Sequence, residues 1–506
     1  MQQVLTRNNR FYFMNRVLAF LFLFVVLLAG DGFSNPANPN NQVSYISRYE
    51  NVLGTSMEIK ITSVSDKQAA LAEKAALAEI NRLNKILSGY NVNSEFSQWM
   101  RTHNKAVPVS KDLFTILNLF DTWRKQSNGA LDAAAELISQ VWKQSALIQQ
   151  LPAQEQLAAS VALVQQQHWV LDAQKQTATH LTNVPLKLNS FAKSYIIQSA
   201  ANAAMRVTGI NGLIVNIGGD MVVAGTVNET VLVSNPTANT ENDAPIDQLQ
   251  ITNKAVATSG NYRRGELING VWYSHIVDPR TGTPASAIVS ATVVAPSATD
   301  AGALATAFNV LTVEECKRLA ASVKDADYLL ITQNGERIES ANWKHLQLET
   351  PAVIHQSDWK NAINISLELK QQEGFAKRPF AAIWIEDKEG NVVKTLALWY
   401  NKPKWLRDLR SWYRKNGSAY TADPAAFASV TGATRSAGKY SFKWDGTDTK
   451  GNSVKQDVYT VYIEVVREHG GYDLLKQEMD CSKKAQQFTL KGNAEITEVM
   501  VNYGKK

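Results

Sequence analysis

Hydrophobic positions follow helical spacing in some parts of the chain and form short extended runs in others. Residues 66–88 carry apolar side chains at near-helical spacing with charges between them, which predicts an amphipathic helix on a core. Residues 111–127 and 132–148 also read as helices, and residues 299–311 read as a helix of small residues. The runs that read as strands are residues 45–63 (broken at Gly54-Thr55), 212–215, 221–223, 231–233 and 288–294. Because these strands are grouped and do not alternate strictly with helices, we expect an α+β fold.

From residue 359 onward the pattern becomes mostly β. The alternating or apolar runs are residues 363–369, 380–387, 392–400 and 458–466. They predict an all-β region. Within residues 440–462, Asp-Gly and Lys-Gly turns between alternating segments predict a β-hairpin.

Periodicity is lost around residues 340–358, which indicates a domain junction. A chain of 506 residues also exceeds what one hydrophobic core usually organises. We therefore expect an α+β domain at residues 45–345 and an all-β domain at 359–504. Residues 35–44 and 346–358 are the expected linkers.

The first 34 residues have the pattern of a secretory signal. Arg7, Arg10 and Arg16 precede an apolar run from Val17 to Ala29 that is short for a membrane span. We expect an exported protein, periplasmic or otherwise extracytoplasmic. An uncleaved N-terminal membrane anchor is the alternative.

The charge, histidine spacing and cysteine content give no indication of a nucleic-acid-binding or zinc-binding protein. The net charge of +6 is mild for this length, and the basic residues are not clustered as nucleic-acid binding requires. The seven histidines show no zinc-type spacing. Cys316 and Cys481 lie far apart; an exported protein could pair them, but we favour two free thiols.

Eight segments, in order, resemble the ApbE-type FAD:protein FMN transferases. They are Leu53-Gly54-Thr55, 87–100, 128–135, 188–200, 215–225, 256–264, 273–286 and 293–311. The resemblance spans about residues 45–345. It implies an enzyme that takes FAD as substrate, transfers FMN to a Thr or Ser of a protein acceptor and releases AMP.

The resemblance also implies which residues contact the flavin nucleotide. These are Leu53, Tyr90, Ala130, Leu131, Asp132, Lys193, Gly218, Gly219 and Val277. Gly218-Gly219 would let the backbone approach a phosphate, although a tight turn explains the pair equally well. His275 is a candidate general base, because an imidazole titrates near neutral pH, or a residue that only hydrogen-bonds in the pocket. Asp278 and Arg280, in isolation, suggest a structural ion pair.

The metal site is where the sequence departs from the family. The family binds Mg²⁺ through an Asp, a Thr four residues later and a backbone carbonyl. The matching Thr is Thr306 and the carbonyl is that of Ser190, but Gly302 stands at the Asp position. Asp300 is nearby, two residues off, which on a helix is a rotation of about 200°.

At residue 187, relatives usually carry Asp, whereas this chain has Lys. Lys187 could therefore replace part of the cation, with Lys187 and Thr306 contributing to catalysis. A metal held through Asp300, Asp220 or substrate phosphate is a second possibility. The competing interpretation is a pocket that binds FAD without cleaving it.

The C-terminal region, residues 359–504, resembles an uncharacterised periplasmic β domain and the Ig-like repeat of flagellar hook-capping proteins. This resemblance implies an all-β, Ig-like sandwich. Before its predicted hairpin, Thr431-Gly432-Ala433-Thr434 matches the acceptor tetrapeptide of FMN transferases. Thr434 would then carry covalent FMN. An ordinary turn is the alternative, and Ala428 stands where the usual motif has Asp.

Three functions are compatible with these sequence features. One is an exported FMN transferase that modifies its own Thr434 or a partner. The second is a flavin-carrying electron-transfer module with a membrane-embedded redox partner. The third is a structural adaptor. Residues 404–415 predict a short basic helix whose aromatic cluster could dock to a partner, although a core helix is the simpler interpretation.

Overall fold

The computed structural model describes residues 42–348, 357–372, 377–427 and 429–505. The predicted leader at residues 1–34 and its possible use as an anchor lie outside the described residues, as do parts of both linkers. Across the described part of the chain, no helix combines the length and the hydropathy needed to cross a membrane.

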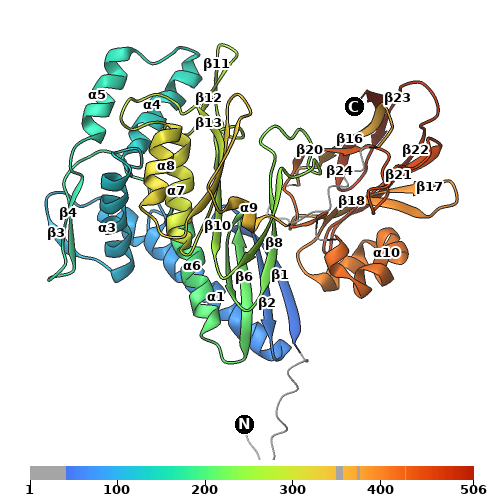
Figure 1. Cartoon of the computed structure of the whole chain (residues 1–506), viewed down its shortest axis with the longest axis horizontal. Helices are drawn as coiled ribbons and strands as arrows, with labels where there is room; N and C mark the ends of the chain where they lie inside the picture. The colour runs from blue at the N-terminus through green and yellow to red at the C-terminus, as the bar shows by residue number, and fades with distance from the viewer. Residues whose placement is uncertain (1–41, 349–356, 373–376, 428, 506) are drawn as a thin grey trace, which may run out of the picture. The chain divides into compact units, whose positions relative to one another are not determined.

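The first region is built on an antiparallel sheet whose strands differ in length (Figure 1). Within the described residues, eight strands pair in the order β1-β2-β6-β7-β10-β13-β14-β15. Their bounds are β1 Val43–Val52, β2 Thr55–Ser63, β6 Ile210–Ile217, β7 Asp220–Gly225, β10 Ala255–Gly260, β13 Ile288–Ala295, β14 Asp327–Thr332 and β15 Arg337–Glu339. The predicted break at Gly54-Thr55 is the turn of the β1–β2 hairpin.

Helices cover one face of this sheet and bury its largest core (Figure 1). Their bounds are α1 Asp66–Leu87, α2 Glu95–Trp99, α3 Lys111–Gln126, α4 Ala135–Ile148, α5 Gln154–Val164, α6 Ala192–Met205, α7 Ala298–Val310 and α8 Val313–Ala321. Ala69, Ala72, Ala76, Ile80 and Leu83 form the buried stripe of α1. The four predicted helices are confirmed, and the α+β class with them.

Shorter elements complete the region. The opposite face of the sheet is covered by the β8–β9 hairpin and α9, around the buried Trp343. The bounds are β3 Ala106–Pro108, β4 Trp169–Asp172, β5 Thr177–His180, β8 Asn228–Val233, β9 Asp247–Thr252, β11 Gly265–Ile268, β12 Val271–Ser274 and α9 Trp343–Leu346.

The C-terminal region is a sandwich of two sheets that share one core. The sheets have the orders β20-β16-β24-β23 and β19-β18-β17-β21-β22. Alternate residues of both, such as Ile365 and Ile383, meet in that core. The bounds are β16 Asn361–Leu369, β17 Phe380–Asp387, β18 Val392–Trp399, β19 Thr431–Gly432, β20 Gly438–Trp444, β21 Val458–Val466, β22 Tyr472–Asp480, β23 Gln486–Lys491 and β24 Ile496–Lys505. The predicted all-β sandwich is confirmed.

The predicted hairpin at residues 440–462 is wrong. Strand β20 pairs with β16 in one sheet, whereas β21 pairs with β17 and β22 in the other. The Asp-Gly and Lys-Gly turns belong to the connection between the sheets, where Thr447 and Ser453 form an isolated bridge outside the named strands. Alternation identifies a strand but not its partner, so adjacent strands with turns between them need not pair.

The predicted basic helix is present, and its aromatic cluster is core. The 3₁₀-helix η1 (Pro403–Asp408), α10 (Arg410–Ala422) and η2 (Pro424–Phe427) pack on the outer face of the β17–β18 sheet. Leu406, Leu409 and Trp412 are buried, while Trp405 and Tyr413 are partly buried. These side chains pack against the sheet. They therefore do not form the exposed aromatic surface that would have favoured docking to a partner.

Both cysteines are buried and free, as favoured from the sequence. Cys316 lies in α8 and Cys481 follows β22. Burial raises the pKa of each thiol to about 12. Neither is therefore a reactive thiolate at neutral pH.

Candidate active site

A cavity of about 440 Å³ is the main candidate site. Six parts of the first region line it: the start of α4, the segment before α6, the β6–β7 turn, β10 with the loop after it, the segment after β12, and α7. Its volume falls in the range of small-molecule sites. The sequence segments singled out above therefore converge on one place.

Most of the predicted site residues line this cavity. They are Ala130, Leu131, Asp132, Lys187, Ser190, Lys193, Gly218, His275, Val277 and Thr306. Five others do not line it: Leu53, Tyr90, Gly219, Asp300 and Thr434.

Tyr90 lies next to lining residues, and Leu53 lies in the turn that leads into β2, the strand that contacts the glycine turn. Tyr90 is 75% exposed; its hydroxyl accepts a hydrogen bond from Asn189 Nδ2 at 2.9 Å, and Lys187 Nζ is 5.6 Å from its ring centroid. It therefore sits at the rim. Leu53 begins the β1–β2 turn, which meets the glycine turn, since Gly218 N–H donates to the Ser56 carbonyl at 2.9 Å.

The Gly218-Gly219 pair forms the turn between β6 and β7. Both residues have positive φ, +62° and +95°. A Cβ on Gly218 would lie 2.7 Å from the Thr55 side chain. The positive φ and the close approach of Thr55 thus explain why residue 218 is a glycine. The same turn presents its backbone to the cavity.

Asp132 is fixed at the cavity wall before α4. Its carboxylate is bound by Arg124 Nε at 2.7 Å and accepts the Ala134 N–H at 2.8 Å. Burial raises the pKa of this carboxyl, and the charge of Arg124 opposes that shift. Asp132 is consequently a positioned, paired group.

His275 has one ring nitrogen committed and one available. Nδ1 lies 3.0 Å from the Arg264 carbonyl oxygen, which can only accept, so Nδ1 carries the proton. In the neutral ring Nε2 is then an unprotonated acceptor. Desolvation lowers the pKa of His275 below its ordinary 6.5, and the charges of Arg264 and Lys143 lower it further. At neutral pH the imidazole is therefore mainly in the form that accepts a proton.

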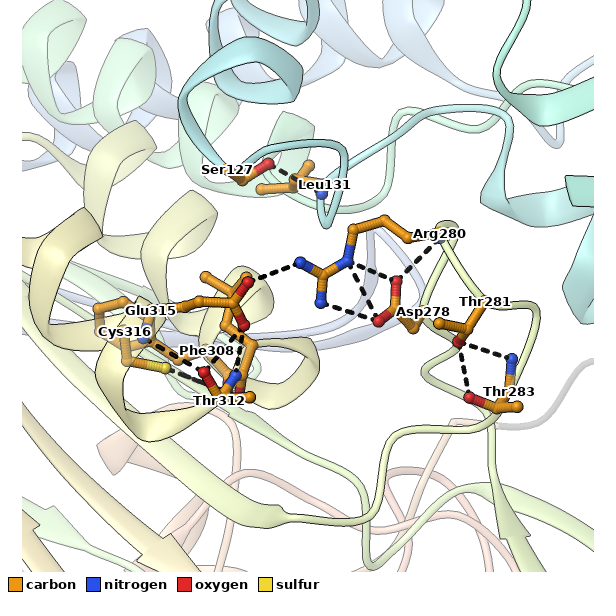
Figure 2. A network of polar contacts seen from close by, with 11 residues as sticks. Ser127, Leu131, Asp278, Arg280, Thr281, Thr283, Phe308, Thr312, Glu315 and Cys316 are labelled. Carbon is orange, nitrogen blue, oxygen red and sulfur yellow. Dashed lines mark hydrogen bonds and ion pairs between the residues drawn. The ribbon is translucent and has the colours of Figure 1, made fainter. Parts of the chain in front are cut away.

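Arg280 anchors the loop that carries His275 and Val277. Figure 2 shows its guanidinium between two carboxylates: Asp278, at 2.9 Å, and Glu315 of α8, also at 2.9 Å. Glu315 also completes the capping box with Thr312 at the start of α8. The structural ion pair expected for Asp278 and Arg280 is confirmed.

Replacing Arg280 with methionine should destabilise the protein by about 1–3 kcal/mol, because Asp278 and Glu315 lose their shared charge-assisted partner. The matched control is Lys317→Met, which removes an exposed pair with Glu314 and should leave the stability essentially unchanged. Urea unfolding measures both. Equal effects of the two substitutions would contradict the anchoring role.

The residues at the expected metal position do not fit Mg²⁺. The Thr306 hydroxyl is 3.1 Å from the Ser190 carbonyl and 3.0 Å from the Gly302 carbonyl, and so is already hydrogen-bonded. Asp300 lies in the first turn of α7 and does not line the cavity. Among the described residues, no three His, Cys, Asp or Glu side chains gather as metal ligands do. A hard cation would find no free carboxylate beside Thr306.

Thr434 is removed from solvent. Thr434 is 1% exposed, and its hydroxyl donates a hydrogen bond to the carboxylate of Glu50 in β1. Thr431 and Gly432 form the short strand β19 beside β18. The tetrapeptide is therefore partly strand, and in this conformation its last hydroxyl is not available to an enzyme.

Four residues that sequence reasoning did not assign also line the cavity or its wall. Glu136, Arg263 and Arg264 are lining residues, and Ser194 is packed against Gly302. The adjacent arginines within the matched segment 256–264 were a signal for an anion site. Nothing in the sequence pattern pointed to Glu136 or to the contact of Ser194 with Gly302.

A cavity lined by cations and a histidine, in an α+β fold with a Gly-Gly turn, defines a small-molecule site suited to a phosphorylated ligand. Comparison with protein families gives a specific match. Residues 53–330 match the ApbE family, and residues 360–498 match a predicted periplasmic protein family, DUF2271. The chain belongs to the ApbE family.

Curated relatives agree with that assignment. A FAD:protein FMN transferase of Haemophilus influenzae is 29% identical over 313 residues, which is 58% of this chain and 89% of the relative. The FAD:protein FMN transferase of Escherichia coli K12 is 26% identical over 299 residues, 57% of this chain and 84% of the relative.

Solved structures share the fold of the first region. The ApbE protein of Thermotoga maritima matches with a TM-score of 0.54 and 24% identity, over 61% of this chain and all of that one. The flavin transferase ApbE from Vibrio cholerae matches with a TM-score of 0.51 and 21% identity, over 60% and 99%.

Proposed function

We propose that this protein is an exported FAD:protein FMN transferase. The observation that carries the proposal is the composition of the cavity in this member of the ApbE family. His275 presents an unprotonated Nε2 there, and positive charge comes from Lys187, Lys193, Arg263 and Arg264. The match of the C-terminal region to a predicted periplasmic family supports export, as does the expected leader.

The proposed reaction is a phosphoryl transfer. A Thr or Ser hydroxyl of the acceptor attacks the FMN-side phosphorus of FAD. One P–O bond forms, the P–O bond to AMP breaks, and AMP leaves with the bonding electron pair. His275 Nε2 takes the hydroxyl proton. Fixed cations stabilise the negative charge that the phosphoryl oxygens and the leaving group develop.

The acceptor that we favour is another protein. Burial of Thr434 and its bond to Glu50 support transfer in trans, because modification in cis would require Thr434 to leave that contact. Thr434 stays a predicted acceptor for any state in which this segment opens. A flavin on the acceptor would make it a redox carrier, which suits a membrane-embedded redox partner.

Release of AMP from FAD tests the proposal. The purified protein is incubated with FAD, a peptide of residues 426–438 and an extracytoplasmic extract of its own host, and AMP is quantified by chromatography. A transferase should release AMP in an amount equal to the flavinated product, whether that product is the peptide or a protein of the extract. FAD that binds without any AMP release would favour the competing interpretation, a binding module descended from the enzyme.

The pH dependence of kcat/KM should report His275. Its pKa is lowered below 6.5, so Nε2 is protonated, and the base lost, only at more acidic pH. We expect kcat/KM to rise with pH, with its midpoint below 6.5, and to be flat through neutrality. A midpoint above 7 would contradict the assignment of His275 as the base.

A further inference from the structure

The carboxylates that line the cavity are all engaged by cations. Glu136 pairs with Lys187 at 2.7 Å, Asp220 pairs with Lys193 at 2.8 Å, and Asp132 pairs with Arg124. Burial raises the pKa of Asp220, and Lys193 opposes that shift. None of the three is free to act as a ligand for a divalent cation.

The cations retain hydrogen-bonding capacity toward the cavity. Lys187 and Lys193 both line it, and their side chains are 28% and 32% exposed. An ammonium group has three donors, and these carboxylate contacts use one on each lysine. Arg263 and Arg264 also line the cavity, and within the described ranges neither forms an ion pair. The lining therefore presents fixed positive charge.

The position where a carboxylate would complete a metal site is filled by another side chain. A Cβ added to Gly302 would lie 2.2 Å from Ser194 Oγ and 3.0 Å from Ser194 Cβ. Ser194 is only 2% exposed and has little room to yield. A carboxylate at residue 302 would therefore require Ser194 to rotate and shift within a packed contact between α6 and α7.

We propose that this cavity binds the diphosphate of FAD directly through Lys187 and Lys193, with Arg263 and Arg264 at its margin, and needs no divalent cation. Lysine ammonium groups bind phosphate as point charges, and guanidinium groups bind it through paired donors. The inference rests on the proposed function for the identity of the ligand. The inference is tested by FAD binding, which can be detected even if the protein releases no AMP.

Titration of FAD into the intact protein, with EDTA or with Mg²⁺, tests the proposal. We expect the two Kd values to agree within about twofold. The double variant Glu136→Gln/Lys187→Met removes the ammonium without changing the net charge of the pair and should weaken FAD binding about tenfold, the effect of one lost charge-assisted contact. The control Lys175→Met removes an exposed pair with Asp172 and should leave Kd unchanged.

A second pair of variants tests the steric argument. Gly302→Asp alone should lower the thermal midpoint, because the new Cβ meets Ser194. Gly302→Asp/Ser194→Gly should recover it and make FAD binding tighter with Mg²⁺ than with EDTA. The proposal is overturned if the wild-type protein binds no FAD or binds it only with Mg²⁺. It is also overturned if the Glu136→Gln/Lys187→Met variant binds FAD with the same Kd as the wild-type protein. Mg²⁺-independent FAD binding without AMP release would instead leave it standing and remove the transferase activity.

Discussion

Replacing His275 with alanine should lower the rate of AMP release by about 10²–10⁴-fold, the usual contribution of a positioned general base. The reason is that Nε2 is the unprotonated ring nitrogen, while Nδ1–H is held by the Arg264 carbonyl. FAD affinity should change little, because the fixed cations on the cavity wall remain. Single-turnover AMP release and FAD titration measure the two effects separately.

Two further variants sharpen that result. His275→Asn can keep a donor toward the Arg264 carbonyl but has no group to accept the proton, so its rate should be as low as that of alanine. His103→Ala, at an exposed histidine, should keep the wild-type rate. If His275→Asn retained activity, the role of His275 would be to hold the loop and not to accept a proton.

Replacing Trp412 with alanine should destabilise the β-sandwich region by about 3–5 kcal/mol. Trp412 is fully buried in the cluster that joins α10 to the outer face of the β17–β18 sheet, and its indole N–H donates to Thr395 at 3.2 Å. The substitution therefore leaves a cavity as well as an unpaired hydroxyl. Thermal or urea unfolding of the whole protein measures the loss.

Trp405→Ala is the matched control for that prediction. Trp405 belongs to the same aromatic cluster but is only partly buried, with Lys404 Nζ 4.5 Å from its ring centroid. We expect a clearly smaller loss of stability than for Trp412. Equal and small losses for both would mean that the cluster is not core and would revive the docking interpretation.

The secondary structure was predictable where one pattern decided it. Helix α1 shows a single buried stripe, and the β1–β2 hairpin is marked by Gly54. Pairing was not predictable in the sandwich, because β20 and β21 both alternate and yet belong to different sheets. The partner of a strand is set by long-range packing that local periodicity does not encode.

The site was predictable as far as family motifs marked it. His275, Lys187, Lys193 and Thr306 come from separate segments of the chain and line one cavity, while their roles stay predictions. The contact between Ser194 and Gly302 could not be foreseen, because it joins α6 to α7 through space. The burial of Thr434 was equally hidden, since its partner Glu50 lies in the first strand of the chain's other region.

Mass spectrometry of the flavinated product tests the central claim most directly. The purified protein, FAD and EDTA are incubated with the peptide of residues 426–438 and with an extracytoplasmic extract of its own host, and AMP and covalent FMN are measured together. We predict AMP and FMN-bearing product in equal amounts, without added divalent cation and dependent on His275. Bound FAD with neither AMP nor any flavinated product, with EDTA or with Mg²⁺, would contradict the assignment as a transferase.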